Sequence, residues 1–436
     1  MASTYLTWTP SGAGNRKTWT YSGWLKKEKA DTAMVLLGCN NSYSTGTSGS
    51  IAFHNSSYFH TYAMNGISSN VGYWGTTRLF RDTNAWYHIV VAMDTTQATT
   101  TDRQKLWING VQETSFAYPN YPTQNYDCPF NDGTVFQIGG DALNGVHFDG
   151  VMSHVHFCDG TAYDASAFGE YDSNGVWKIK TSPSVTYGTN GFFILKDGNS
   201  VTDQSPNTNN FTVAGGTLTN TEDSPSNVFN VWNALVSYPT YPNSFTNGNT
   251  TITANANAGN GSTSPGTIGV SSGKYYFEFK VTSSTMNNSS IGMCKADMNF
   301  NYQSDAYPYN ASLGNNGIHY LGDGTIVVNG SSVGNQGAWS QNDIIGLAVD
   351  LDNGNIAFTK NGSAVYTSSN GTLISGQEYT PAFYGYGSLS GSANFGNGYF
   401  GTTAVASAGT NTSGIGIFEY DVPTGYTALC TKGLNL

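Results

Sequence analysis

Apolar and polar residues alternate with a period of two along most of this chain. Successive side chains of a β-strand point to opposite faces of a sheet, so each alternating run is a predicted strand. The runs in the first half are residues 17–27, 85–94, 105–116, 134–140 and 146–157. Those in the second half are residues 274–282, 289–295, 324–330, 343–352, 355–362 and 379–387. No run longer than about a dozen residues has the 3.6-residue period of an amphipathic helix, so the pattern predicts an all-β protein.

The segment "VDLDNGNIAFTKNG" at residues 349–362 combines two Asn-Gly pairs with two carboxylates. An EF-hand calcium loop that began at Asp350 would need Gly at its sixth position and Glu at its twelfth. Asn355 and Asn361 occupy those positions, so a calcium loop of this kind is disfavoured. Alternating runs flank Asn353-Gly354, and Asn-Gly between such runs is typical of a two-residue type I′ hairpin turn. We therefore expect a β-meander here.

The predicted strands fall into two series, separated by a polar stretch at residues 198–225. We place a boundary within that stretch, which gives domains of residues 1–222 and 223–436. A chain of 436 residues is long enough for two domains with separate cores. Short strands joined by tight turns are typical of antiparallel sandwiches. The sequence thus predicts two antiparallel β-sandwich domains of jelly-roll type in tandem, the second with a C-terminal extension.

Composition and charge narrow the classes of function. Only 10% of the residues are charged, 28 are Tyr and 22 are Phe, which is the opposite of a disordered composition. The net charge of −11 disfavours nucleic-acid binding, which needs Lys and Arg gathered on one face. The basic cluster of Lys26, Lys27 and Lys29 is expected to be a solvated strand end. Nucleic acid is therefore not an expected partner.

Targeting signals and cysteine frameworks are not expected either. The N-terminal "MASTYLTWTP" lacks a charged segment followed by an apolar one, so we expect no secretory signal peptide. Nowhere do 18 consecutive apolar residues occur, so we expect no membrane insertion. The five cysteines are widely spaced and include no CxxC pair, so we expect buried thiols and no disulfide framework.

Two sets of motifs resemble known domain families. "WYHIVVAMD" and "KLWINGVQ" resemble the paired core strands of concanavalin A-like domains of the laminin G or pentraxin type. "SSGKYYFEFKV", "IGMCKAD", "NDIIGLAVDLDNGNIAFTKNG" and "PAFYGYG…ANFG" occur in the order typical of a SPRY domain, over roughly residues 265–396. Both families are two-sheet β-sandwiches, so the resemblance agrees with the fold that the strand pattern predicts.

The combination of the two domains resembles virion structural proteins of tailed bacteriophages. Further segments carry this resemblance, among them "AGNRKTWTYSGWLKK", "FGEYDSNGVWKIK" and "PTGYTALCTKGL". It implies a non-enzymatic protein of the virion surface, made in the host cytoplasm, that takes part in adhesion to a host cell-surface glycan or receptor within a fibre or appendage. The implied partners are other virion proteins and further copies of this chain. The alternative is a capsid or tail decoration protein, and a lesser alternative is a glycan depolymerase.

Local candidates for catalysis are two pairs of carboxylates, Glu170 with Asp172 and Asp350 with Asp352. Residues two apart on a strand share a face, and paired carboxylates carry out glycoside hydrolysis. Carboxylates that flank turns are more often solvated, however, and no nucleophile elbow, P-loop or zinc-protease motif occurs in the sequence. We therefore do not expect an enzyme.

Two metal sites can be considered. His154 and His156 lie two apart on a predicted strand, downstream of His147, so both imidazoles could reach one ion. The competing interpretation is a polar outer face of a sheet. The laminin G and pentraxin resemblance implies calcium at a sandwich rim, and the loop at residues 139–150 offers oxygen ligands in Asp141, Asn144 and Asp149. No other cofactor is expected.

Tyrosine-rich segments are the stronger functional candidates. Residues 55–65, 116–127 and 299–310 look like loops that combine Tyr with Asn, Gln and Pro. Aromatic rings are typical of protein interfaces and of sugar sites, and they also pack within domains, so three interpretations remain open. The SPRY resemblance independently nominates residues 299–309 as a contact loop. The candidate binding residues are Tyr58, Tyr62, Tyr118, Tyr121, Tyr126, Tyr302, Tyr307 and Tyr309.

Overall fold

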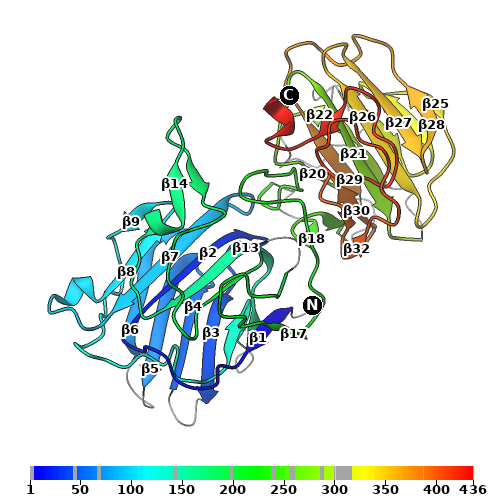
Figure 1. Cartoon of the computed structure of the whole chain (residues 1–436). Helices are drawn as coiled ribbons and strands as arrows, with labels where there is room; N and C mark the ends of the chain where they lie inside the picture. Colours follow the sequence, from blue (N-terminus) through cyan, green and yellow to red (C-terminus); the bar gives the residue numbers. More distant parts are fainter. Residues whose placement is uncertain are drawn as a thin grey trace. The chain divides into compact units, whose positions relative to one another are not determined.

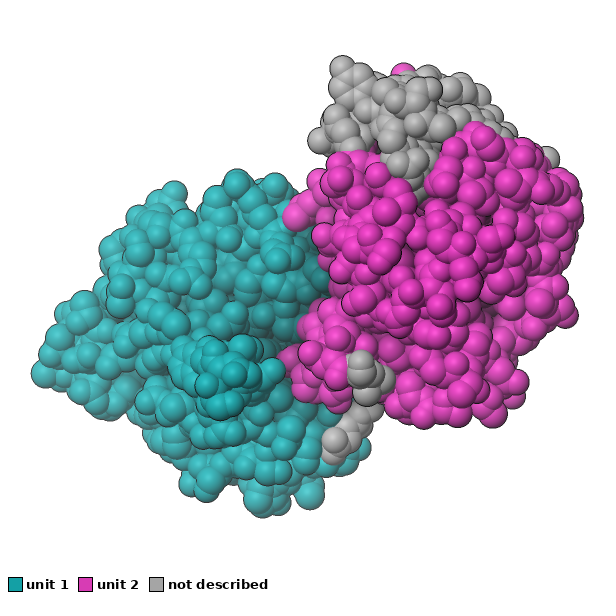
Figure 2. Space-filling model, turned by 90° about the horizontal axis from the view of Figure 1, so that it is seen from above, with its two compact units in different colours: residues 1–220 teal, residues 221–436 magenta. Residues whose placement is uncertain are grey.

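The chain folds into two compact units, residues 1–220 and 221–436, close to the boundary expected at residue 222 (Figure 2). In this computed structural model the described residues are 4–42, 47–65, 70–141, 145–196, 200–236, 241–255, 261–284, 289–298, 300, 317–385 and 387–435. They form strands and three short 3₁₀ turns, η1 (Thr100–Asp102), η2 (Ala165–Ala167) and η4 (Gly433–Asn435), with no α-helix among them. The all-β fold class is confirmed.

Unit 1 is a sandwich of two antiparallel sheets (Figure 1). The first sheet has the order β17 (Thr212–Gly215), β1 (Tyr5–Trp8), β10 (Phe136–Ile138), β3 (Met34–Ser42), β4 (Thr47–Phe53), β5 (Tyr58–Asn65) and β6 (Asn70–Leu79). The second has the order β16 (Phe192–Ile194), β13 (Gly150–Asp159), β2 (Thr18–Lys27), β7 (Trp86–Asp94), β8 (Gln104–Ile108) and β9 (Val111–Glu113). Two hairpins are attached, β11 (Gly140–Asp141) with β12 (Val146–His147) and β14 (Gly169–Tyr171) with β15 (Trp177–Ile179).

Strand β2 shows how the alternation in the sequence builds the unit 1 core. Trp19, Tyr21 and Leu25 face the interior, where Trp19 packs on the ring of Phe157 with centroids 5.7 Å apart. The other face of this sheet is covered as well, because residues between 163 and 187 pack across it in a second apolar cluster. Both faces of β2 are therefore buried, and its polar outward residues need partners inside the protein.

Asn-Gly pairs close several hairpins in the way that the sequence predicts. At Asn361-Gly362, between β27 and β28, both residues have positive φ, 52° and 78°. Asn109-Gly110 has the same signature, with φ values of 49° and 79°. The prediction for Asn353-Gly354 is wrong in detail. Asp350 pairs with Asn355 across four loop residues, and Gly354 has positive φ while Asn353 does not, so this turn is longer than the two-residue type I′.

Unit 2 is a second sandwich of two sheets (Figure 1). One has the order β18 (Ser244–Thr246), β19 (Thr251–Thr253), β30 (Ser390–Asn394), β21 (Lys274–Val281), β26 (Ile344–Asp350), β27 (Asn355–Lys360) and β28 (Ser363–Thr367), and β33 (Thr427–Ala428) runs parallel to β21. The other has the order β20 (Ser262–Pro265), β29 (Tyr379–Gly385), β22 (Ser289–Lys295), β23 (Ile318–Leu321), β24 (Thr325–Val328) and β25 (Ser331–Asn335). A small hairpin joins β31 (Tyr399–Phe400) to β32 (Thr403–Ala404).

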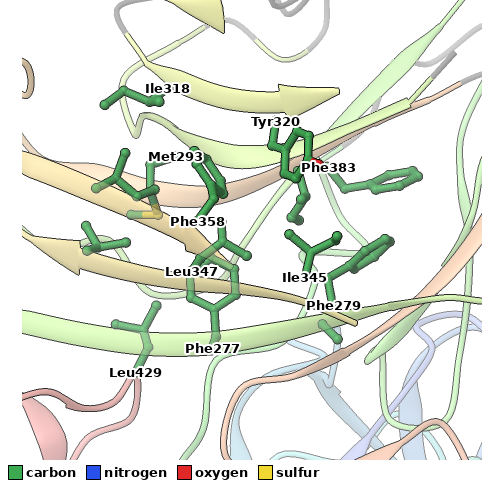
Figure 3. Packing of buried hydrophobic residues seen from close by; sticks show 14 of the residues in the cluster. Phe277, Phe279, Met293, Ile318, Tyr320, Ile345, Leu347, Phe358, Phe383 and Leu429 are labelled. Atoms are coloured by element: carbon green, nitrogen blue, oxygen red, sulfur yellow. The ribbon is translucent and has the colours of Figure 1, made fainter. Parts of the chain in front are cut away.

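The core of unit 2 lies between its two sheets. Phe277 and Phe279 point inward from β21, beside Leu347 of β26 (Figure 3). They meet side chains of the opposite sheet, and the rings of Phe279 and Phe383 are 5.5 Å apart at their centroids. Tandem sandwiches with separate cores are therefore confirmed.

The C-terminal segment of unit 2 covers the outer face of the larger sheet. Phe418 packs on Tyr276 there, with ring centroids 5.1 Å apart. The buried carboxylate of Glu278 accepts hydrogen bonds from the backbone N–H groups of Glu419 and Tyr420, at 2.9 and 2.8 Å. Burial raises the pKa of Glu278 to about 7, although these hydrogen bonds act in the opposite direction. The carboxylate thus fastens the C-terminal segment to the middle of the sheet.

Segments near the start and the end of unit 2 are also paired with each other. Phe229 forms an isolated antiparallel bridge with Cys430. On one side of this bridge Thr431 N–H donates to Val228 O, and on the other Asn230 N–H donates to Leu429 O. The two ends of the unit therefore close into a short ladder.

Two of the three lysines in the basic cluster and all five cysteines are buried. The basic cluster is not a solvated strand end, because Lys26 and Lys27 are buried. Lys27 points inward, donates to Phe80 O at 3.0 Å and lies 4.4 Å from the centroid of the Phe53 ring. The five cysteines are all buried thiols, as expected.

Candidate functional site

A groove of about 400 Å³ lies on the outer face of the first sheet of unit 1. Its floor consists of small residues of two neighbouring strands, Val35 of β3 and Ser50 and Ala52 of β4. Alternation along β4 explains this arrangement, since Ile51 and Phe53 belong to the core. Small outward side chains leave a depression along the middle of the sheet, and a volume in this range can hold a small ligand.

One wall of the groove is a row of rings on strand β5. Tyr58, His60 and Tyr62 alternate with the inward-facing Phe59 and Thr61. The rings of His60 and Tyr62 are nearly parallel, at 8°, with centroids 6.3 Å apart. Tyr62 pairs with Ser50 and His60 pairs with Ala52 in the β4–β5 ladder, so these two rings stand directly beside the floor.

Further rings support this row from both ends. His54 stacks on Tyr58 at 4.3 Å and 13°, and its Nδ1 accepts the N–H of Ser56 at 3.2 Å. The hydroxyls of Tyr58 and Tyr73 are 3.0 Å apart, and Tyr118 packs on Tyr73 at 5.7 Å. The rings hold one another in place, so the wall is preorganised for a ligand.

The opposite wall is the hairpin β11–β12, which contributes Asp141 and Val146. Gly38 of β3 allows this hairpin to lie against the sheet, because a Cβ at Gly38 would be 2.8 Å from Gly140 O. Asp141 is buried and adds a carboxylate to the groove. The groove is therefore bounded by aromatic rings on one side and by an acidic hairpin on the other.

Electrostatically, the groove contains little positive charge near neutral pH. Burial, and to a lesser extent His54, lowers the pKa of His60 to about 4, so its imidazole is neutral. Among the described lining residues none is Lys or Arg. The chemistry that the groove offers is stacking on rings together with hydrogen bonding to hydroxyl, amide, imidazole and carboxylate groups.

The tyrosines nominated from the sequence have different environments. Tyr62 lines the groove, and Tyr58 and Tyr118 belong to the ring cluster beside it. Tyr121 packs edge-on against Trp74 at 5.0 Å, and Tyr126 packs against the core, so intradomain packing accounts for these two. Tyr302, Tyr307 and Tyr309 lie outside the described residues, as does the proposed SPRY contact loop apart from Phe300.

Sequence reasoning missed His54, His60 and Tyr73 as parts of this site. The segment at residues 55–65 was expected to be a loop, whereas residues 58–65 form strand β5. The period-two spacing of Tyr58, His60 and Tyr62 around the apolar Phe59 is a strand signal that would have identified it.

The calcium prediction is only partly covered by the structure. Asp141 lines the groove, Asp149 forms an ion pair with Lys29 at 3.0 Å, and Asn144 lies outside the described residues. In the part of the chain that the structure describes, no three His, Cys, Asp or Glu side chains gather so that they could hold a metal ion. Calcium binding stays a prediction.

The His154-X-His156 pair is not arranged as the sequence suggests. A β-bulge shifts the register between Ser153 and His156, and His154 has a positive φ of 50°. His156 is buried against the ring of Phe193, 3.9 Å away at the centroids, and its Nδ1 lies 2.9 Å from the hydroxyl of Tyr187. The outer-face interpretation is also wrong, because residues between 163 and 187 cover this face.

His88 lies beneath the same covering segment, and both of its ring nitrogens have hydrogen-bond partners. Its Nδ1 accepts the indole N–H of Trp177 at 3.0 Å, so its Nε2 carries the proton that faces Ser22 Oγ, 2.9 Å away. Burial lowers the pKa of His88 to about 3, and nearby His154 adds to the effect. With Nδ1 occupied and Nε2 protonated, His88 cannot act as a base toward Ser22.

The candidate catalytic carboxylates are parts of turns and ladders. Asp350 forms an ion pair with Lys274 at 3.0 Å and accepts the N–H of Asn353, while Asp352 accepts the N–H of Gly273. Asp172 accepts the N–H groups of Asn174 and Val176 in the β14–β15 turn. These hydrogen bonds give the carboxylates a structural role.

No helix among the described residues is long and apolar enough to cross a membrane.

Each unit matches a family model over part of its length. Residues 1–166 match the concanavalin A-like lectin/glucanases superfamily, and residues 274–398 match the SPRY domain. Each match covers less than half of the chain. The chain thus carries a concanavalin A-like domain followed by a SPRY domain, as the sequence motifs indicate.

Solved structures and curated sequences add little to these matches. The SPRY domain of human HERC1 is 18% identical, covers 37% of this chain and 96% of its own, and has a TM-score of 0.30. The TRIM65 PSpry domain is 12% identical, with 38% and 91% coverage and a TM-score of 0.30. A human SPRY domain is 19% identical, with 33% and 90% coverage and a TM-score of 0.25. Likeness at this level bears on neither ligand nor partner. No curated protein matches the chain.

Proposed function

We propose that this chain is a non-enzymatic surface protein of a tailed-bacteriophage virion that binds host cell-surface glycan through the groove of unit 1. The observation that carries the proposal is the wall of rings on β5 beside a floor of small residues. Sugar rings have apolar C–H faces and many hydroxyls, so they suit a site that combines aromatic rings with polar oxygens. The virion assignment rests on the resemblance of the sequence motifs to phage structural proteins.

The test of adhesion uses the purified full chain on host cells and on a glycan array. Tyr62→Ala removes a ring from the groove wall, and Tyr171→Ala removes an exposed tyrosine of the β14–β15 hairpin as the matched control. We expect Tyr62→Ala to weaken binding about tenfold, equivalent to about 1.4 kcal/mol, and the control to bind like the wild type. Equal binding by wild type and Tyr62→Ala would remove the groove from the proposal.

An exposed apolar patch favours a second function, that of a capsid or tail decoration protein. The hairpin β14–β15 projects from unit 1 (Figure 1). Its Tyr171 and Val176 are 53% and 50% exposed. The hairpin packs on the β8–β9 turn, where Trp177 contacts Gly110 and Val111 is 54% exposed. Apolar side chains gathered on a projecting hairpin are typical of contact surfaces, and neighbouring virion subunits or further copies of this chain would cover them.

Particle assembly separates the two functions. Under the decoration hypothesis, Tyr171→Ser with Val176→Ser prevents incorporation into virions, whereas Tyr62→Ala does not. Electron cryo-microscopy of intact particles then finds the chain distributed over the capsid or tail. Density confined to a tail tip, together with loss of host attachment in Tyr62→Ala particles, would favour adhesion instead.

The proposal that the chain is not an enzyme is supported by the engagement of its paired carboxylates in turns and ladders. Degradation of host polysaccharide by the purified chain, followed by gel filtration of the products, would contradict it and favour a depolymerase.

A further inference from the structure

The segments that form the groove contain neither Lys nor Arg. The lining residues come from the stretches 33–73 and 141–146. In the sequence, residues 30–77 and 106–177 are free of both Lys and Arg. The segments that form the groove therefore contribute no Lys or Arg side chain to it, and any such cation would have to come from flanking residues.

Basic residues that flank these stretches are engaged elsewhere. Lys27 is buried and donates to Phe80 O, although its ammonium lies close to Phe53. Lys29 pairs with Asp149 at 3.0 Å, and Arg78 pairs with Glu113 at 3.1 Å. None of the three lines the groove. An anionic ligand would thus find no cation among the described lining residues to offset its charge.

The residues of the groove floor are shielded from water, so the charge of a ligand that contacts them strongly affects its binding. Val35, Ser50 and Ala52 are 5%, 2% and 3% exposed, and Asp141 beside them is 2% exposed. A ligand that contacts this floor gives up much of its hydration, and a carboxylate, sulfate or phosphate loses more by this than a hydroxyl does. The carboxylate of Asp141 adds repulsion, which is strongest where water is excluded.

We propose that the groove selects neutral glycans and rejects glycans that carry carboxylate, sulfate or phosphate groups on the ring that enters it. This inference rests on the proposed glycan-binding function and names the ligand class of the same site. Hydroxyl groups donate to Asp141 and exchange hydrogen bonds with Ser50, while an apolar ring face stacks on Tyr62. Selectivity arises from repulsion as much as from attraction.

The test compares the full-length protein on paired glycans. The array carries neutral oligosaccharides beside the same structures with uronic acid, sialic acid, sulfate or phosphate substituents, and isothermal titration is then carried out on the best pair. We expect the anionic member to bind at least about tenfold more weakly, and the neutral member to bind almost independently of salt.

A charge placed in the groove tests the mechanism. Val146→Lys puts a cation on the hairpin wall, and Val333→Lys makes the same change on the exposed strand β25 of unit 2 as a control. We expect Val146→Lys to recover binding of the anionic member at low salt, and Val333→Lys to keep wild-type selectivity. Both variants are compared once their unfolding midpoints have been measured and found equal to that of the wild type.

The outcomes separate this inference from the proposed function. Binding of anionic glycans as tight as that of neutral ones, or unchanged selectivity in Val146→Lys, overturns the charge selection and leaves glycan binding in place. Binding to no glycan of either class overturns the glycan-binding function itself. If Tyr62→Ala still binds neutral glycans with full affinity and still prefers them to anionic ones, the assignment of binding to this groove is overturned.

Discussion

Acidification should unfold unit 1 before unit 2, because buried histidines are concentrated in unit 1. Burial lowers the pKa of His60 to about 4 and that of His88 to about 3, and it lowers the pKa of His156 well below its usual range. The folded unit keeps these imidazoles neutral, whereas the unfolded chain takes up protons below pH 6.5. Stability is therefore complete above pH 6.5 and is lost as the pH falls below it.

The size of the effect follows from proton linkage. Each histidine that is charged only in the unfolded state costs about 1.4 kcal/mol per pH unit. Three of them reduce the free energy of unfolding by about 4 kcal/mol per pH unit, or about 8 kcal/mol between pH 6.5 and 4.5. The total stability of a domain is about 5–15 kcal/mol, so unit 1 should be close to its unfolding midpoint at the lower pH.

Unit 2 contains two titratable groups whose effects on its stability depend on pH in opposite directions. Burial lowers the pKa of His319 to about 4, which destabilises the unit as the pH falls. The raised pKa of Glu278, about 7 against 4.5 in the unfolded chain, has the reverse effect. Its stabilising contribution is complete below pH 4.5 and is lost as the pH rises through 7, because the folded state binds the proton more tightly. The two slopes nearly cancel between pH 6.5 and 4.5.

Scanning calorimetry of the full chain at several pH values, with hydrogen exchange to assign each transition, measures both slopes. We expect one transition to move steeply downward with acid and the other to stay nearly constant. His88→Gln, whose amide oxygen can still accept from Trp177, should lessen the steep slope by about one third. Parallel shifts of the two transitions, or a steep slope that His88→Gln leaves unchanged, would refute the linkage argument.

Two further predictions concern single contacts. Gly362→Ala and Gly371→Ala both place Ala at a φ near 77°, which costs about 1–2 kcal/mol. At Gly362 the added Cβ would also lie 2.7 Å from Tyr420 Cδ1, whereas at Gly371 it would have no neighbour within 4 Å. Urea unfolding should show the larger loss for Gly362→Ala, and equal losses would contradict the contact. Trp177→Phe leaves the buried Nδ1 of His88 without its donor and should cost unit 1 about 1–3 kcal/mol, with the midpoint of unit 2 as the control.

Strand alternation was sufficient to locate elements that have one distinctive apolar stripe. The runs at 17–27, 85–94, 289–295 and 343–352 correspond to β2, β7, β22 and β26 to within a few residues. Strands such as β4, "TSGSIAF", were missed because their outward residues are small and form a groove floor, so no strong alternation of size or polarity marks them. Run 105–116 is a hairpin, because Asn109-Gly110 folds it back on itself.

The candidate site was only partly accessible from the sequence. Tyr58, Tyr62 and Tyr118 could be nominated because tyrosine is typical of contact surfaces. That Asp141 lies across the groove from Tyr62 depends on the β11–β12 hairpin packing over Gly38, a contact between distant parts of the chain that no local pattern encodes. The burial of His156 likewise depends on the later segment that covers its sheet.

The short ladder between Phe229 and Cys430 has a mechanical consequence. Because the paired segments are antiparallel, residues 221 and 435 lie beyond the same end of the ladder. A tensile load applied between those two positions would open the hydrogen bonds one after another, as a zipper opens, instead of shearing them together. The first barrier to extension would be this ladder, and β33, which pairs with β21 in the larger sheet, would have to peel away before the load reached the Glu278 attachment. Unit 2 would then yield in steps, beginning with the ladder that joins its two ends.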